Sequence, residues 1–90
     1  MVRIVKKAEV RRAEIVQAAR DLFQTQKYEK VTMQEVMERL GIAKGTIYHH
    51  FQSKEELLEA VVENIVAEQI TRMRQVVDAA EGSALDKLRL

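Results

Sequence analysis

The chain of 90 residues contains no proline and only three glycines, Gly41, Gly45 and Gly82. Since proline and glycine interrupt helices most strongly, long helices are permitted almost everywhere else. Three apolar stripes recur at the three- and four-residue spacing of a helix face: Ile15, Ala18, Ala19, Leu22 and Phe23; Met33, Val36, Met37 and Leu40; and Leu58, Val61, Val62 and Ile65. No segment sustains the alternation of a strand. The sequence therefore predicts an all-α fold.

Size and composition limit the possible classes of protein. Ninety residues suffice for one small domain, and the 47% apolar and 32% charged content is typical of a globular chain. The absence of cysteine excludes disulfides and thiolate metal sites. No apolar run approaches the roughly 18 residues of a membrane span, and the N-terminus lacks the apolar centre of a signal peptide. We therefore expect no membrane association, a cytoplasmic location and no cofactor.

The net charge of +1 hides an uneven distribution. The first 30 residues carry eight basic and four acidic side chains, whereas the remaining 60 carry seven basic and ten acidic ones. A basic N-terminal third suggests a polyanionic partner on that side of the molecule. Composition alone equally allows a solvated, charged tail.

Helix starts are marked by capping boxes, in which a hydroxyl accepts a bond from a free N–H and an acid three residues later reaches back. The expected helices run from about Val10 to Gln26, from the box Thr32/Glu35 to Gly41, through a short third helix, and from the box Ser53/Glu56 to about Ala80. A further box, Ser83/Asp86, predicts the start of a fifth helix after Gly82. That helix has few residues before Leu90, so we expect the chain to be a fragment of a longer protein.

The segment from Thr32 to Phe51 has the plan of a helix-turn-helix, in which the second helix enters the DNA major groove. At about 100° per residue, Ile47 and Phe51 lie close together and face the core, while Gly45 and His49 lie opposite. Tyr48 and Thr46 occupy the flanks. Lys44 lies nearer the core side of the wheel, but because it is in the first turn its long side chain can extend past the helix end toward a phosphate or a guanine edge.

Each of these residues also has a structural interpretation. Gly45 could relieve crowding against another helix, and Tyr48 could be a half-buried aromatic. Adjacent histidines such as His49 and His50 point about 100° apart, and the chain has no other histidine, which argues against a metal site. Both could instead be exposed without consequence.

The stretches "EIVQAARDLF" and "VTMQEVMERLGIAKGTIYHHFQSKEELLEAV", and above all "KGTIYHHF", resemble the TetR family of bacterial transcriptional repressors over about residues 10–62. The resemblance implies a homeodomain-like, TetR-type head of three helices, a long fourth helix and the start of a fifth. It also implies a division into a basic N-terminal arm (1–9), a helix-turn-helix domain (10–52), a connecting helix (53–80) and the beginning of a truncated C-terminal regulatory domain (81–90).

The resemblance assigns roles at matching positions. Lys44, Gly45, Thr46 and His49 match positions that meet bases or the adjoining backbone, and Gln34 one near the groove edge. The positions expected to contact phosphates are Thr32, Tyr48, His50 and Lys54. Family members are dimers on palindromic operators, released by a small-molecule inducer. We expect this fragment, which lacks that inducer domain, to be monomeric or weakly associating.

Two positions depart from the family pattern. Lys27 stands where the family usually has glycine, so either it adopts a left-handed conformation at a cost of roughly 1 kcal/mol or the turn differs. Ala43 stands where serine is frequent, so the third helix is expected to start without a side-chain cap.

The main alternative is a helical protein-interaction module that docks through the long fourth helix. An enzyme is not expected, because the acids are scattered and no glycine-rich phosphate loop is present. The salt dependence of binding distinguishes the DNA-binding hypothesis from the protein-interaction hypothesis, because DNA binding weakens steeply with salt whereas an apolar interaction hardly changes.

Overall fold

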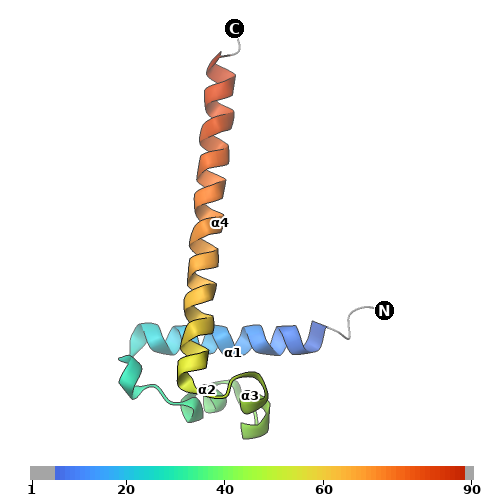
Figure 1. Cartoon of the computed structure of the whole chain (residues 1–90), viewed down its shortest axis with the longest axis vertical. Coiled ribbons are helices and arrows are strands. Elements are labelled where there is room, and N and C mark those ends of the chain that lie inside the picture. The colour runs from blue at the N-terminus through green and yellow to red at the C-terminus, as the bar shows by residue number, and fades with distance from the viewer. Residues whose placement is uncertain (1–5, 89–90) are drawn as a thin grey trace.

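The computed structural model describes residues 6–88, and every regular element in that range is helical (Figure 1). In chain order the elements are α1 (Lys6–Thr25), the short 3-10 helix η2 (Tyr28–Lys30), α2 (Met33–Leu40), α3 (Lys44–His50) and α4 (Lys54–Leu88). The prediction of an all-α fold is confirmed. None of the helices within residues 6–88 combines the length and apolar composition that a membrane span requires.

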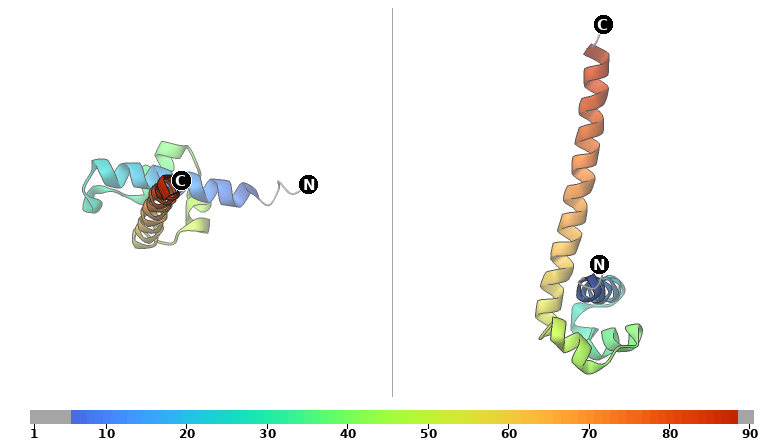
Figure 2. Two further views of the ribbon diagram at one scale, coloured as in Figure 1. Left: turned by 90° about the horizontal axis from the view of Figure 1, so that it is seen from above. Right: turned by 90° about the vertical axis from the view of Figure 1, so that its right-hand side faces the viewer.

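The molecule consists of a compact head, residues 6–52, and one long projecting helix. Within the head, α1 packs against α2, and α2 packs against α3. The first turns of α4 pack against α1, and α4 then rises away from the head, as the right-hand view in Figure 2 shows. The side chains of residues 69–84 are all exposed, and the longest dimension of the molecule is 62 Å.

A single apolar core holds the head to the base of α4. Its buried members are Ile15, Val16, Ala18, Ala19, Leu22, Val31, Met33, Val36, Ile47, Phe51, Leu57, Ala60 and Val61. Burial of each large apolar side chain stabilises the fold by about 1.5–3 kcal/mol. The stripes predicted on α1 and α2 are confirmed as the faces that contribute to this core.

The stripe predicted on α4 is displaced by one residue. Leu57 and Ala60 are buried with Val61, whereas Leu58 is half-buried and Val62 is exposed. The sequence has two adjacent apolar pairs, at 57–58 and 61–62, and the helical period alone does not indicate which member of each pair faces the core. The way in which α4 crosses α1 determines which member is buried.

The predicted boundaries of α2 are confirmed in detail. The Thr32 hydroxyl accepts a hydrogen bond from the Glu35 N–H (3.1 Å), and the Glu35 carboxylate accepts one from the Thr32 N–H (3.1 Å). The helix ends at Gly41, whose φ of 66° lies in the left-handed region that glycine adopts without strain.

The second capping box forms in an altered way. The Ser53 hydroxyl accepts a bond from the Glu56 N–H (3.1 Å), as predicted. The Glu56 carboxylate, however, accepts a bond from the N–H of Gln52 (3.0 Å), one residue before the predicted donor. The Glu56 carboxylate therefore stabilises the turn that leads into α4.

The first helix begins earlier than predicted. It starts at Lys6 rather than about Val10, so part of the segment expected to be a basic arm is helical. Residues 1–5, with Arg3, lie outside the described range. Lys27 has φ −65° and ψ 143°, an ordinary extended conformation, so the turn after α1 avoids the left-handed strain by using η2 instead.

The predicted fifth helix is wrong as a separate element, because α4 runs without a break from Lys54 to Leu88. Gly82 lies inside this helix and does not adopt a positive φ. An interior glycine costs about 1 kcal/mol relative to alanine but keeps its N–H, so the helical hydrogen bonds can continue through it. The Asp86 side chain of the expected capping box lies outside the described side chains.

Candidate nucleic-acid interface

The helix-turn-helix consists of α2, the turn at residues 41–43 and α3. Gly41 reverses the chain, and the Ile42 N–H then donates to the Met37 carbonyl (3.1 Å), which closes the turn. The N–H groups of Thr46 and Ile47 donate to the Ala43 carbonyl. Ala43 supplies no side-chain cap, as predicted, so α3 begins with uncapped N–H groups.

Two buried side chains anchor α3 to the head. Ile47 is fully buried and Phe51 is 2% exposed. Gly45 and His49, on the opposite side of the helix, are exposed, as is Lys44 at its start. This arrangement confirms the orientation predicted from the helical wheel.

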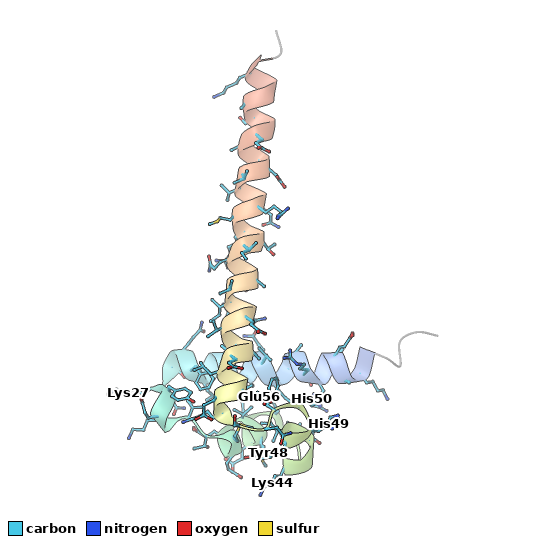
Figure 3. All side chains as sticks on the ribbon, in the orientation of Figure 1. Lys27, Lys44, Tyr48, His49, His50 and Glu56 are labelled. Atoms are coloured by element: carbon cyan, nitrogen blue, oxygen red, sulfur yellow. The ribbon has the colours of Figure 1, made fainter. Side chains whose placement is uncertain are left out.

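The exposed surface of α3 lies at the end of the head that is remote from the free end of α4. Figure 3 shows Lys44, Tyr48 and His49 on this side. Thr46 and Tyr48 are half-buried, on the flanks predicted for them. We call the surface formed by Lys44, Gly45, Thr46, Tyr48 and His49 the α3 surface.

Gly45 does not relieve crowding inside the fold. A Cβ atom added at this position would meet no other atom within 4 Å, apart from its own neighbours and the backbone of its helix. The internal packing therefore gives no reason for glycine here, although glycine costs about 1 kcal/mol relative to alanine in a helix.

Tyr48 combines a packing role with partial exposure. Its side chain is half-buried and packs against the core, as the structural interpretation proposed. Its carbonyl accepts a bond from the Gln52 side-chain amide (2.6 Å), which ties the end of α3 to the turn before α4. Packing against the core holds the ring at the edge of the α3 surface.

The two histidines occupy different environments. Their ring centroids are 5.0 Å apart with the rings almost perpendicular. His49 is exposed, whereas His50 is half-buried. Burial lowers the pKa of His50, and the positive charges of His49, Arg12 and Arg11 lower it further. Within residues 6–88, no group of three histidine or acidic side chains is placed to hold a metal ion.

The predicted contacts outside α3 have partners within the protein. The Thr32 hydroxyl caps α2, and the Gln34 amide donates to Glu38 (2.9 Å) on the exposed side of the same helix. The Lys54 ammonium donates to the Tyr28 carbonyl (2.9 Å) and lies 4.2 Å from the Tyr28 ring centroid. Lys54 therefore connects the start of α4 to η2, a contact that the sequence did not predict.

Sequence reasoning also missed a contact between α1 and α3. The Arg12 guanidinium lies over the Phe51 ring, 5.0 Å from its centroid. Arg11, beside it, pairs with Glu14 (2.9 Å). Together with His50, these side chains form a basic group where α1 meets the end of α3. The excess of basic residues in the N-terminal third of the sequence indicated a basic group on this side of the molecule, but it did not indicate that Arg12 would contact Phe51.

A short helix anchored by two buried side chains after a glycine turn, with its polar face exposed, defines a helix-turn-helix protein of the kind that binds DNA. Comparison with protein families agrees. Residues 15–61 match the model of the tetR family of bacterial regulatory proteins. The chain belongs to this family of transcriptional regulators.

Curated relatives support the same assignment. The chain is 35% identical to the HTH-type transcriptional repressor KstR2 of Mycolicibacterium smegmatis, over 87% of this chain and 38% of the relative. It is 34% identical to the HTH-type transcriptional regulator YfiR of Bacillus subtilis (87% and 40%) and 32% identical to the nucleoid occlusion factor SlmA of Alteromonas mediterranea (81% and 37%). The chain thus spans about two fifths of the length of these relatives. No solved structure shows a significant match.

Proposed function

We propose that this chain is the DNA-binding part of a transcriptional repressor and that α3 is its recognition helix. The observation that carries the proposal is the α3 surface: a polar, exposed face held rigidly by Ile47 and Phe51. An α-helix with such a face fits the major groove of B-DNA, which is about 12 Å wide.

The exposed centre of α3 is proposed to read the bases. His49 projects opposite the buried side, where its ring nitrogens reach a base edge and its carbons a thymine methyl. Gly45 lies on the same face and lets the backbone approach the groove floor. Lys44 and Thr46 extend the contact toward a guanine edge and the adjoining backbone.

The flanks are proposed to hold phosphates, which fix the position of the head without reading sequence. Thr32 and Gln34 lie at the start of α2, Tyr48 and His50 on α3, and Lys54 at the start of α4. Lys54 has to share or leave its bond to the Tyr28 carbonyl to reach a phosphate. The N-terminus of α4 offers N–H groups to the same strand.

The remaining features of the proposal rest on the family. We propose that the complete protein acts in the cytoplasm as a homodimer on a palindromic operator. Release by a small-molecule inducer would require a ligand-binding part, and the relatives have additional length for one. The isolated chain is proposed to be monomeric or weakly associating, so its affinity lacks the gain of two linked heads. No catalytic activity is proposed.

The experiment is a fluorescence titration of the chain against a DNA sequence selected from a random pool, at several salt concentrations. If four phosphates are neutralised, the affinity should fall about 100-fold between 50 and 200 mM salt. Lys44→Ala should weaken binding, whereas the matched control Gln75→Ala, on the exposed part of α4, should not. Binding that is insensitive to salt, or equally affected by both variants, would contradict the proposal.

A protein-interaction module is the second candidate, and one observation favours it. Large apolar side chains are exposed along α4: Val62, Val66, Ile70, Met73, Val76 and Val77. A helix face of this kind is typical of a surface that another protein element covers. The two functions are compatible, because the α3 surface and this face of α4 lie on different elements.

A further inference from the structure

The contact between α1 and α4 has a polar part beyond the core. The buried residues of α4 end at Val61, and Ile65 is half-buried. Almost one turn beyond Ile65, the Arg20 guanidinium spans to Glu68 through two hydrogen bonds, 2.9 Å from Nη2 to Oε1 and 3.3 Å from Nη1 to Oε2. Nη1 also donates to the Asn64 side-chain oxygen (2.9 Å).

This contact differs from the other ion pairs of the head. The Arg20 side chain is only 16% exposed, whereas Arg11 and Arg39, in their ion pairs, are 42% and 50% exposed. A planar guanidinium that bonds both oxygens of a carboxylate fixes direction as well as distance. Arg72, one turn further along α4, lies 3.7 Å from the same Glu68 oxygen, Oε1, and adds a second positive charge beside the carboxylate.

We propose that Arg20 and Glu68 form a latch that sets the direction in which α4 leaves the head. The buried contact of α4 is confined to the part near its N-terminal end, where Leu57, Ala60 and Val61 reach the core. A contact near one end of a long helix leaves the helix some freedom to change direction about that end. The two-bond contact of Glu68, about two turns further along α4, removes this freedom.

A small change in the direction of α4 at the latch displaces the far end of the helix by a large distance, because α4 is long. From Glu68 to Leu88 the helix extends roughly 30 Å, at about 1.5 Å per residue. A change of about 10° in direction at the latch therefore moves the far end by roughly 5 Å. In a regulator of the proposed kind, that direction decides how the α3 surface is presented relative to whatever α4 is attached to.

The link to regulation rests on the proposed function, but the latch itself does not. Glu68 and Arg20 stabilise each other's charged forms: the hydrogen bond from Arg20 lowers the pKa of Glu68, and the bond to Glu68 raises the pKa of Arg20. The pair is therefore ionised at neutral pH. Neither residue lies on the α3 surface.

The test measures the direction of α4 in the full 90-residue chain. The chain has no cysteine, so Gln24→Cys on α1 and Gln75→Cys on α4 provide a unique pair of exposed sites for spin labels. Pulsed electron paramagnetic resonance then gives the distribution of distances between them. Arg20→Gln and Glu68→Gln should each widen or shift this distribution by several ångström, and the double variant should change it no further.

The matched control is Arg11→Gln, which removes an ion pair of the same length confined to α1. It should leave the distribution unchanged. Arg20→Lys should give an intermediate width, because it keeps the charge and loses the two-pronged geometry. Should Arg20→Gln fail to fold by circular dichroism, Glu68→Gln, which keeps the size of the side chain, gives the same reading.

A distribution in Glu68→Gln that matches the parent chain would overturn the latch, whatever the effect on melting temperature. The DNA titration separates this failure from failure of the proposed function. If the chain binds no DNA but Glu68→Gln widens the distance distribution, the latch is supported and the proposed function is contradicted. If the chain binds DNA normally but Glu68→Gln leaves the distribution unchanged, the proposed function is supported and the latch is contradicted.

Discussion

The Arg12 guanidinium lies over the face of the Phe51 ring, 5.0 Å from its centroid, and thereby joins the N-terminal half of α1 to the residue that ends α3. Phe51 is buried on its other side in the core. A positive side chain from α1 thus covers the anchor of α3 while keeping its charge at the surface.

We predict that Arg12→Gln weakens both the fold and DNA binding. Loss of a cation–π contact at an exposed site should lower the free energy of unfolding by about 0.5–1 kcal/mol. We also propose that the exposed guanidinium of Arg12 contacts a phosphate, so affinity should fall alike for all DNA sequences, because a phosphate carries no sequence information. Chemical unfolding and titration against two duplexes measure the two effects, with Arg11→Gln as the control for charge alone. An unchanged unfolding midpoint would show that the ring contact contributes nothing.

Gly45 and Gly82 offer a matched pair of substitutions. Both lie in helices, and a Cβ atom at either would meet nothing within 4 Å apart from its own neighbours and helix backbone. Gly45→Ala and Gly82→Ala should therefore each stabilise the fold by about 0.5–1 kcal/mol. Only Gly45→Ala should also weaken DNA binding, because its methyl group would lie against the base edges. Thermal unfolding and titration of both variants test this, and normal DNA binding by Gly45→Ala would count against close approach at that position.

The stability of the head should depend on pH through His50. Its pKa in the folded chain is below the ordinary value of 6.5, mainly because burial disfavours the charged ring. The unfolded chain therefore binds more protons in this range, so stability rises with pH through the window below about 6.5 and is lost as the pH falls toward the folded pKa. Thermal unfolding between pH 5 and 8 should show this slope, and His50→Asn should reduce it. A slope that persists unchanged in His50→Asn would contradict the assignment.

Local signals in the sequence predicted the elements that local interactions determine. The capping box of Thr32 and Glu35, the left-handed Gly41 and the burial of Ile47 and Phe51 all depend on residues within about one or two turns of each other. The same signals placed Gly45 and His49 on the exposed side of α3, whereas Lys44 was expected to escape the core side only because it lies in the first turn. Their proposed contacts with DNA remain predictions.

Contacts between distant segments could not be predicted in this way. The crossing of α4 over α1 decides that Leu57 rather than Leu58 is buried, and it brings Arg20 to Glu68. Arg12 contacts the ring of Phe51, and Lys54 bonds the carbonyl of Tyr28, through the packing of other segments that lie far apart in the sequence. Gly82 does not end a helix here. A glycine ends a helix when it adopts a positive φ and the chain changes direction, and Gly82 does neither.

The proposed function depends on His49 contacting a base edge while Tyr48 contacts a phosphate. The most direct measurement is a titration of His49→Ala and Tyr48→Phe against the preferred operator, a one-base variant of it and random DNA, at fixed salt. His49→Ala should lose about 1–3 kcal/mol on the preferred operator and little on random DNA, whereas Tyr48→Phe should lose about 0.5–1.5 kcal/mol on all three. If Tyr48→Phe alters the preference while His49→Ala weakens all three duplexes equally, the proposed orientation of α3 on DNA is wrong.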